Sequence, residues 1–366
     1  MSFQDRLATL QAGLADRDAD AMALYPGPNT LYLAGFFGEP LDRHLLVCVP
    51  ETGEPWVVTP RKSLDLVRDQ SPIEKVRVTD ANDSGAVSRR FAEELPGEVD
   101  DLLVDGRAPF SVTGPLDAAA DAALDTADPL LTEARIRKDD GEVAALERSA
   151  AVADEVSEEI RAKGPRAVGA TERELAQEIR GLLHAKGATR LSFDVVVASG
   201  PNAANPYLRH GDRRIREGEP VVLDFGAFVD GYASDQTRTV VFGGAPPDGF
   251  EAAYDAVRAA LDAGVEAVEP GIPVGTVDDA ANAVVEEHGF GENLVHATGH
   301  GVGLEAHEAP TVAGGNDRPL EPGMVFSVEP GVYVEGEWGV RVEDLVVVTG
   351  DGCRRLNHSP RTWKPL

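Results

Sequence analysis

The stretch VVLDFGAFVDGYASDQTRTVV, residues 221–241, has the pattern of a β-hairpin. Its two valine-rich ends flank Asp230-Gly231, a pair typical of two-residue hairpin turns. Pairing across this turn places Asp224 and Asp235 on the same face of adjacent strands, as diagonal neighbours with Cα atoms about 7–8 Å apart. Two carboxylates so close among apolar residues repel each other unless a cation or a shared proton lies between them. Either aspartate alone would be read as a solvated strand residue, but the pair predicts a charged site within the sheet.

Three later segments add side chains of similar chemistry. A glycine-rich segment carries His300 and His307, and its glycines let the backbone bring an imidazole close to a neighbour. Glu329 lies at the end of a predicted strand. Arg341 and Glu343 alternate with valines, so both project from one face of another predicted strand. A carboxylate within a β-branched strand is costly unless its charge is compensated.

Together these segments supply four carboxylates and one imidazole. They are Asp224, Asp235, His300, Glu329 and Glu343. Such a set suits divalent cations and can hold two of them through bridging carboxylates. Two cations about 3.5–4 Å apart lower the pKa of a bridging water and polarise a carbonyl oxygen. The residues therefore predict a dinuclear metal site suited to that chemistry.

These residues resemble the pita-bread metallopeptidases of family M24, which include prolidase, aminopeptidase P and methionine aminopeptidase. The resemblance covers the chain from about residue 135 to its end and rests on four motifs in order: D-x-G-x7-S-D-x-T-R-T, G-H-G-x-G-L-x-x-H-E, S-V-E-P-G and V-R-x-E-D. Residues 28–36, PNTLYLAGF, are similar to the creatinase/prolidase N-terminal domain. The implied fold is α+β, with a C-terminal pita-bread domain of pseudo-two-fold αα-β units preceded by a smaller α/β domain.

The resemblance also implies roles. The five residues above become the metal ligands, Asp235 and Glu343 bridge the two ions, and Glu329 assists as general base. His307 and Arg341 line the substrate site, where they polarise the scissile carbonyl or hold a carboxylate. The implied reaction is hydrolysis of Xaa-Pro bonds, by a dipeptidase or an aminopeptidase, with a metal-bridging water as nucleophile. Mn or Co are the expected ions, with Zn or Fe also compatible. The expected partners are small peptides with proline second, and the family and chain length favour a dipeptidase and a homodimer.

One position departs from the family pattern G-P-N-x-x-x-P-H, whose histidine takes part in catalysis. Here the run ends in Tyr207, and His210 could replace the missing histidine only if the loop bends. Tyrosine can donate a hydrogen bond to an oxyanion, but its pKa near 10 makes it a poor proton shuttle near neutrality. This leaves open a second hypothesis, a non-peptidase lyase or hydrolase of the same fold. A third, a binding module without metal, conflicts with the five retained ligands.

The remaining sequence indicates two domains. Helical and strand patterns alternate over the first 130 residues, and we place the boundary near residue 132, giving domains 1–132 and 133–366. In the second domain a helix–helix–strand pattern occurs twice, with long amphipathic helices expected over residues 139–163 and 250–268. A capping box at residues 171–174 opens another expected helix.

The chain is strongly acidic, with 63 acidic and 34 basic residues and a net charge of −29. This balance excludes nucleic acid as a main partner and disfavours an anionic membrane surface. Only six basic residues are lysine, a composition typical of salt-loving organisms, and a halophilic archaeon is the expected source. The start of the chain lacks a signal-peptide pattern and its two cysteines form no motif, so we expect a cytoplasmic protein. Because molar salt shortens the Debye length to about 3 Å, we expect folding and activity to need it.

Overall fold

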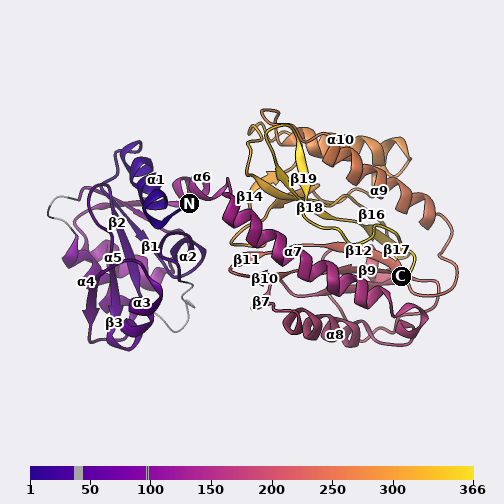
Figure 1. Ribbon diagram of the computed structural model, residues 1–366, viewed down its shortest axis with the longest axis horizontal. Coiled ribbons are helices and arrows are strands. Elements are labelled where there is room, and N and C mark those ends of the chain that lie inside the picture. The colour runs from indigo at the N-terminus through magenta and orange to yellow at the C-terminus, as the bar shows by residue number, and fades with distance from the viewer. Residues whose placement is uncertain (37–43, 96, 98) are drawn as a thin grey trace. The chain divides into compact units, whose positions relative to one another are not determined.

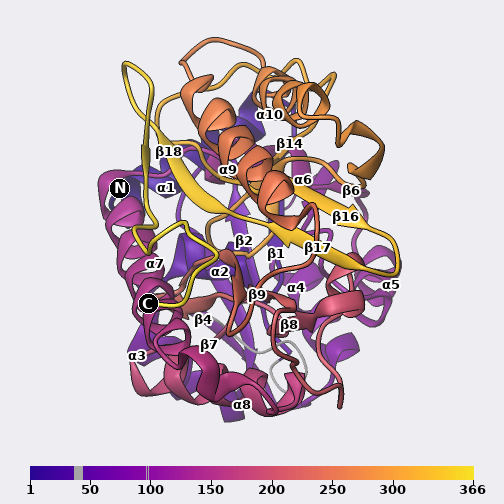
Figure 2. The ribbon, with the colours of Figure 1, turned by 90° about the vertical axis from the view of Figure 1, so that its right-hand side faces the viewer.

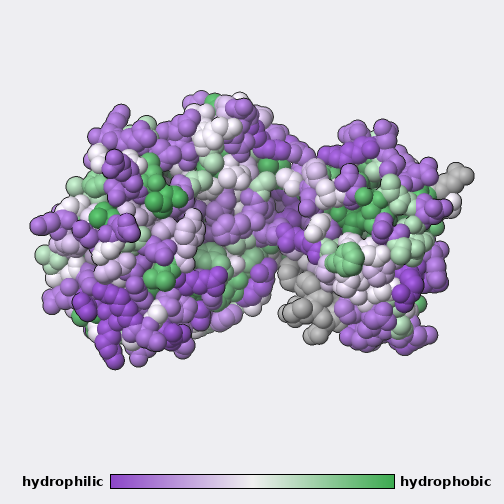
Figure 3. All heavy atoms as spheres, turned by 180° about the vertical axis from the view of Figure 1, so that it is seen from behind, coloured by the Kyte–Doolittle hydropathy of each residue, from purple (hydrophilic) through white to green (hydrophobic). Residues whose placement is uncertain are grey.

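The computed structural model describes residues 1–36, 44–95, 97 and 99–366 of the chain. They form two compact units, Met1–Arg135 and Ile136–Leu366, which divide the chain close to the expected boundary near residue 132. Among these residues, no helix combines the length and apolar character required to cross a membrane. Hydrophilic residues cover most of the face shown in Figure 3 on both units, in keeping with the acidic composition.

The first unit is a six-stranded sheet flanked by helices (Figure 1), as expected for a small α/β domain. Its strand order is β4-β3-β2-β1-β5-β6. The strands are β1 (Ala21–Leu24), β2 (Leu46–Pro50), β3 (Trp56–Pro60), β4 (Lys75–Thr79), β5 (Asp101–Val104) and β6 (Ala123–Thr126). The helices are α1 (Phe3–Ala15), α2 (Pro28–Ala34), α3 (Leu64–Gln70), α4 (Ser84–Glu94), α5 (Phe110–Ala119) and α6 (Asp128–Arg135). Helices α4 and α5 pack on one face through Phe91 and Leu116. Every residue of β1, β2 and β3 is buried, so both faces of these strands are covered and they read as nearly continuous apolar runs.

The second unit repeats a helix–helix–strand arrangement, as the sequence predicts. The helices are α7 (Asp140–Arg161), α8 (Glu172–Ala185), α9 (Phe250–Glu266) and α10 (Gly275–Glu287). The strands lie between the α7–α8 pair and the α9–α10 pair in both ribbon views (Figures 1 and 2). Each helix pair covers its own apolar core. The expected capping box opens α8, where Thr171 Oγ1 accepts a hydrogen bond from Glu174 N at 3.1 Å.

The strands of this unit form four small sheets. In the first half the orders are β12-β9-β8 and β11-β10-β7, and in the second β14-β13-β15-β18-β19 and β16-β17. First-half strands are β7 (Arg190–Leu191), β8 (Val196–Ser199), β9 (Pro220–Asp224), β10 (Ala227–Val229), β11 (Tyr232–Ala233) and β12 (Thr237–Val241). Second-half strands are β13 (Gly299–Gly301), β14 (Glu308–Val312), β15 (Val325–Val328), β16 (Gly331–Val334), β17 (Trp338–Arg341), β18 (Asp344–Val348) and β19 (Cys353–Arg355).

The hairpin predicted for residues 221–241 is confirmed, with its register. Asp230 and Gly231 both have positive φ, 52° and 84°, as a type I′ turn requires. The β10–β11 pairing of Phe228 with Ala233 continues in the same register to the β9–β12 pairing of Asp224 with Thr237. The turn therefore fixes which face of the sheet carries the two aspartates.

Strand β13 depends on its glycines for close approach to its neighbours. A Cβ atom on Gly299 would lie 1.9 Å from the carbonyl oxygen of Ser327, and one on Gly301 would lie 2.1 Å from that of Ala309. Any side chain at these positions would push β13 away from β14 and β15. The glycines thus place His300, between them, within the sheet.

A pair of alanine substitutions tests this packing. Gly299→Ala should lower the free energy of unfolding by about 1–3 kcal/mol or more, because backbone atoms must move to admit the methyl group. Gly181→Ala is the control, since nothing lies within 4 Å of a Cβ atom at this position in α8. It should raise the unfolding free energy by about 0.5–1 kcal/mol. Urea denaturation measures both, and equal effects of the two substitutions would contradict the argument.

Candidate metal centre

The five predicted ligands line one pocket of about 390 Å³ in the second unit. Each lies at a strand end or on a short strand: Asp224 ends β9, Asp235 precedes β12, His300 lies in β13, Glu329 follows β15 and Glu343 precedes β18. Strand ends leave the side chains outside the regular ladder, where several strands can direct them toward one point. The structure thus brings together residues from both halves of the unit.

Three carboxylates form the centre of this group. Ligand oxygens of Asp224, Asp235 and Glu343 lie within 4.8 Å of one another. The residues are 9%, 4% and 1% exposed. Burial, followed by the charges of neighbouring carboxylates, raises the pKa of Asp235 and of Glu343 well above the ordinary range. The protein alone therefore holds these charges at a large electrostatic cost.

Two oxygens of this centre also lack hydrogen bonds. Asp224 Oδ1 and Glu343 Oε1 are buried and have no partner among the described residues. Native proteins rarely bury an unpaired carboxylate oxygen, because its desolvation is costly. Unpaired lone pairs and clustered negative charge both fit a divalent cation with oxygen ligands. The donor set present therefore suits the metal that the sequence predicts.

His300 and Glu329 form the adjoining part of the site. His300 Nε2 lies 3.2 Å from Glu329 Oε1 and 3.7 Å from Asp235 Oδ2. Its Nδ1 lies 3.1 Å from the carbonyl oxygen of Gly301, an acceptor that leaves Nε2 to face the carboxylates. Burial alone would raise the pKa of Glu329, but the hydrogen bond and charge of His300 outweigh it and hold the pKa at about 2. This Nε2 orientation is the one a metal-binding histidine needs.

Arg341 lies deep in the pocket and is fully engaged by protein groups. Its Nη2 is 2.5 Å from Asp224 Oδ2, and its Nε and Nη1 donate to Thr237 Oγ1 and Tyr333 Oη, both at 3.0 Å. Thr237 Oγ1 in turn donates to Glu343 Oε2 at 2.7 Å. Arg341 thus lines the pocket as predicted, and it also orients the carboxylate ligands.

Two further histidines line the pocket. The ring of His307 stacks on that of His300, with centroids 3.8 Å apart, and burial lowers the pKa of His307. His296 Nε2 lies 2.9 Å from Tyr333 Oη, which already accepts a hydrogen bond from Arg341. The carbonyl oxygen of Ala297, 2.8 Å from His296 Nδ1, can only accept, so in the neutral imidazole Nδ1 carries the proton and Nε2 accepts from Tyr333. Sequence reasoning gave no role to His296 or Tyr333; the only signal for His296 was its place in the glycine-rich segment, four residues before His300.

Tyr207 and His210, the two candidates for the place of the family histidine, occupy different positions. Tyr207 lines the pocket and is 78% exposed. His210 is not among the pocket-lining residues, and its Nδ1 lies 2.9 Å from the carbonyl oxygen of Val195. The loop does not bend in the way that would bring His210 to the site of the missing histidine. Tyr207, and not His210, therefore lines the pocket from this loop, together with Pro206 and Arg209.

A buried carboxylate that sequence reasoning missed holds this loop at both ends. Glu172, at the start of α8 and 0% exposed, accepts hydrogen bonds from Ser199 N at 2.8 Å and Gly211 N at 3.0 Å. It also accepts from the side chains of Ser199 and Asn202. Glu172 therefore fixes the path of residues 199–211, which carry Tyr207 to the pocket.

Two family models match the chain, one in each unit. The model of "Metallopeptidase family M24" matches residues 144–350, and that of "Creatinase/Prolidase N-terminal domain" matches residues 6–137. The chain belongs to metallopeptidase family M24. The fold and enzyme class expected from the sequence are confirmed, and membership of this family implies divalent metal ions.

Relatives of this M24 peptidase match it over nearly their full length. It is 36% identical over 362 residues to "Probable dipeptidase PepE" of Mycobacterium tuberculosis, covering 98% of this chain and 95% of the relative. It is 32% identical over 349 residues to "Xaa-Pro dipeptidase" of Pyrococcus horikoshii, covering 93% of each. The structure of the recombinant prolidase from Thermococcus sibiricus matches with a TM-score of 0.93 at 34% identity, covering 100% of both chains.

Metal binding to this M24 peptidase should depend on pH. A carboxyl group whose pKa is raised on folding contributes stability below its unfolded-state pKa, and this contribution is lost as the pH rises through the folded-state value. Asp235 and Glu343 are such groups, and metal binding requires their deprotonated forms. The gain in unfolding free energy on adding Mn should therefore be larger at about pH 7.5 than at about pH 5.5, reaching about 2.7 kcal/mol at 100 times Kd.

Thermal unfolding with and without metal, at both pH values, measures this gain. Glu329, with its pKa at about 2, stays ionised throughout the range and adds no slope. The double variant Asp235→Asn/Glu343→Gln is the control and should lose the gain at both pH values. A gain in the unaltered protein that does not change with pH would contradict the prediction.

Proposed function

We propose that this enzyme is an Xaa-Pro dipeptidase with two divalent ions in the centre described above. The observation that carries the proposal is the convergence of all five donor residues on one pocket, with two buried carboxylate oxygens left unpaired. The near full-length similarity to proteins described as dipeptidases and prolidases supports the substrate class. Mn or Co are the proposed ions, with Zn or Fe as alternatives.

The five donors, Asp224, Asp235, His300, Glu329 and Glu343, would hold the ions. When bound, the ions supply a water of lowered pKa as nucleophile and polarise the scissile carbonyl. Glu329 is ionised at neutral pH and accepts the proton of the attacking water.

The proline nitrogen of an Xaa-Pro bond has no hydrogen and must gain a proton to leave. His307 and His296 line the pocket, and we assign to His307 the donor that faces the scissile bond, because both ring nitrogens of His296 are engaged by Tyr333 and Ala297. The hydrogen bond from Tyr333 leaves His296 with its proton on Nδ1, directed at the carbonyl oxygen of Ala297 at 2.8 Å. Burial lowers the pKa of His307, so its protonated form is a stronger acid than a free imidazolium. Tyr207 donates to the developing oxyanion.

Arg209 supports a dipeptidase rather than an aminopeptidase. It lines the same pocket, its side chain is 64% exposed, and it forms an ion pair with Asp194. Its carbonyl oxygen accepts a hydrogen bond from Val197 N at 2.7 Å, which fixes its backbone beside β8. In a dipeptide the free carboxylate lies two bonds from the scissile nitrogen, so a cation on the pocket wall favours short substrates.

Tyr207 also supports a second candidate, a lyase or hydrolase acting on another small molecule. The family pattern has histidine at this position, and the substitution changes a proton donor among the residues that line the pocket. The similarity to dipeptidases favours the first candidate. We further propose a cytoplasmic homodimer that works in molar salt, on the basis of the family and of the lysine-poor, acidic composition.

Peptide hydrolysis by the Mn-loaded protein tests the proposal. Xaa-Pro dipeptides should be cleaved, and chelation should abolish the activity. Tyr207→Phe should lower kcat/KM about 10²-fold without changing stability, because it removes one hydrogen-bond donor from an exposed side chain. Absence of metal-dependent cleavage of any Xaa-Pro peptide would refute the function and leave the second candidate.

The role of Arg209 is tested with dipeptides and their C-terminal amides. Arg209→Met should raise KM for Xaa-Pro about 10-fold or more, the effect of losing a hydrogen bond to a charged group, and should leave turnover of Xaa-Pro-amide unchanged. Arg180→Met is the matched control, because Arg180 also contacts Asp194, at 2.9 Å, but is not among the pocket-lining residues. Equal effects of the two substitutions would show that Arg209 acts only through Asp194.

A further inference from the structure

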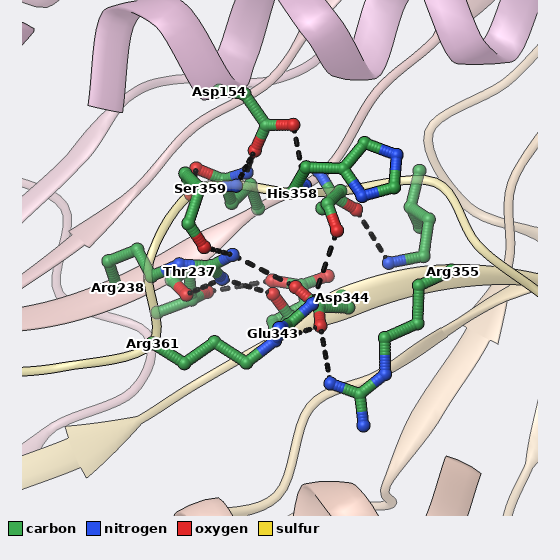
Figure 4. Close-up of polar contacts among 12 residues, drawn as sticks. Asp154, Thr237, Arg238, Glu343, Asp344, Arg355, His358, Ser359 and Arg361 are labelled. Atoms are coloured by element: carbon green, nitrogen blue, oxygen red, sulfur yellow. Dashed lines mark hydrogen bonds and ion pairs between the residues drawn. The ribbon is translucent and has the colours of Figure 1, made fainter. Parts of the chain in front are cut away.

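A buried ionic cluster lies beside Glu343, one of the proposed metal ligands (Figure 4). Arg238 lies on β12, three residues after Asp235, and Asp344 begins β18, next to Glu343. Their side chains are 1% and 0% exposed, and Arg238 Nη2 lies 2.9 Å from Asp344 Oδ1. A buried ion pair adds little to the free energy of unfolding compared with a hydrophobic pair of similar volume. Stability alone therefore does not account for the pair of Arg238 and Asp344.

Arg238 holds the main chain of a metal ligand. Its Nη1 donates to the carbonyl oxygens of Glu343 at 2.5 Å and of Thr237 at 2.9 Å. Glu343 lies between the end of β17 and the start of β18. Its N donates to the carbonyl oxygen of Thr237 at 3.2 Å, outside either strand. Arg238 therefore fixes the backbone of Glu343 from one side, while Thr237 Oγ1 fixes its carboxylate from the other.

The carboxylate of Asp344 accepts hydrogen bonds from three guanidinium groups, as Figure 4 shows. Besides Arg238, Arg355 Nη1 donates to it at 3.2 Å, and Arg361 Nε donates to the same oxygen, Oδ2. Arg355 and Arg361 are 21% and 24% exposed in their side chains, whereas Arg238 is enclosed. Asp344 thereby holds Arg238 in the orientation that reaches Glu343.

The C-terminal segment completes the cluster. Arg238 Nη2 donates to the carbonyl oxygen of Ser359 at 3.0 Å. Asp154 of α7 accepts hydrogen bonds from the backbone N of His358 and Ser359 and from the side chain of Gln236, the neighbour of Asp235. The residues beside both predicted bridging ligands are thus bound to one segment of chain.

We propose that Arg238 is a positioning residue that sets the relative placement of Asp235 and Glu343, so that both can bind the same pair of ions. The inference rests on the proposed metal centre but not on the peptide substrate. Lysine at this position would keep the charge but not the forked set of donors to Glu343, Thr237, Asp344 and Ser359.

Metal affinity tests the proposal, with Mn or Co alone as the probe and calorimetry or chelator competition as the measurement. Arg238→Lys should weaken binding of at least one ion by about 10–100-fold, the range typical of lost outer-sphere contacts. Arg161→Lys is the matched control. Arg161 is also 0% exposed and donates to carbonyl oxygens of the same C-terminal segment, those of Pro360, Thr362 and Lys364, but to no residue next to a ligand. It should change affinity less than about 3-fold on the same scale.

A second variant and a spectroscopic readout keep the test decisive if Arg238→Lys does not fold. Asp344→Asn keeps the volume, removes the anion that orients Arg238, and should weaken binding in the same direction. At saturating Mn, both variants should alter the electron paramagnetic resonance coupling between the two ions. Unchanged affinity and coupling, or equal losses in Arg161→Lys, would overturn the proposal. Two ions bound without peptide cleavage would instead refute the proposed function alone.

Discussion

The mutual repulsion of buried carboxylates governs the design of the second unit. Asp224, Asp235 and Glu343 are held close together where water cannot screen them, and each raises the cost of ionising its neighbours. A folded chain tolerates such an arrangement only if surrounding groups fix the side chains firmly. Around this centre, Arg341 and Thr237 bind the carboxylates directly, and Arg238 binds the backbone behind them.

The apolar core of each half also helps to fix the strands that carry these carboxylates. Helices α7 and α8 pack on strands β8, β9 and β12, and helices α9 and α10 pack on β15 to β18. Each half delivers carboxylates at strand ends, and neither half holds the complete donor set. Because the helix–helix–strand unit occurs twice, both repeats contribute strand-end residues to one pocket.

The sequence alone predicted the parts of this site that follow from local rules. The Asp230-Gly231 turn fixed the hairpin register and with it the shared face of Asp224 and Asp235. The family motifs added His300, Glu329 and Glu343, which the structure brings into the same pocket. These inferences needed only short segments, each read within a few residues.

Contacts between distant segments could not be predicted in this way. Arg238 reaches Ser359, 121 residues later in the chain, and no periodicity or motif links the two. The position of His210 could not be predicted either, because the path of its loop depends on Glu172, which accepts hydrogen bonds from Ser199 N and Gly211 N. A pattern within the loop holds no information about a carboxylate on a preceding helix.

The attachment of that loop has an evolutionary consequence. Because Glu172 binds both ends, the residues between them can be exchanged while the entry and exit points stay fixed. Tyr207 and Arg209 stand on this stretch, whereas all five metal ligands stand outside it. The two pocket positions on this stretch, Tyr207 and Arg209, can therefore change by single substitutions while the proposed metal-ligand positions are preserved.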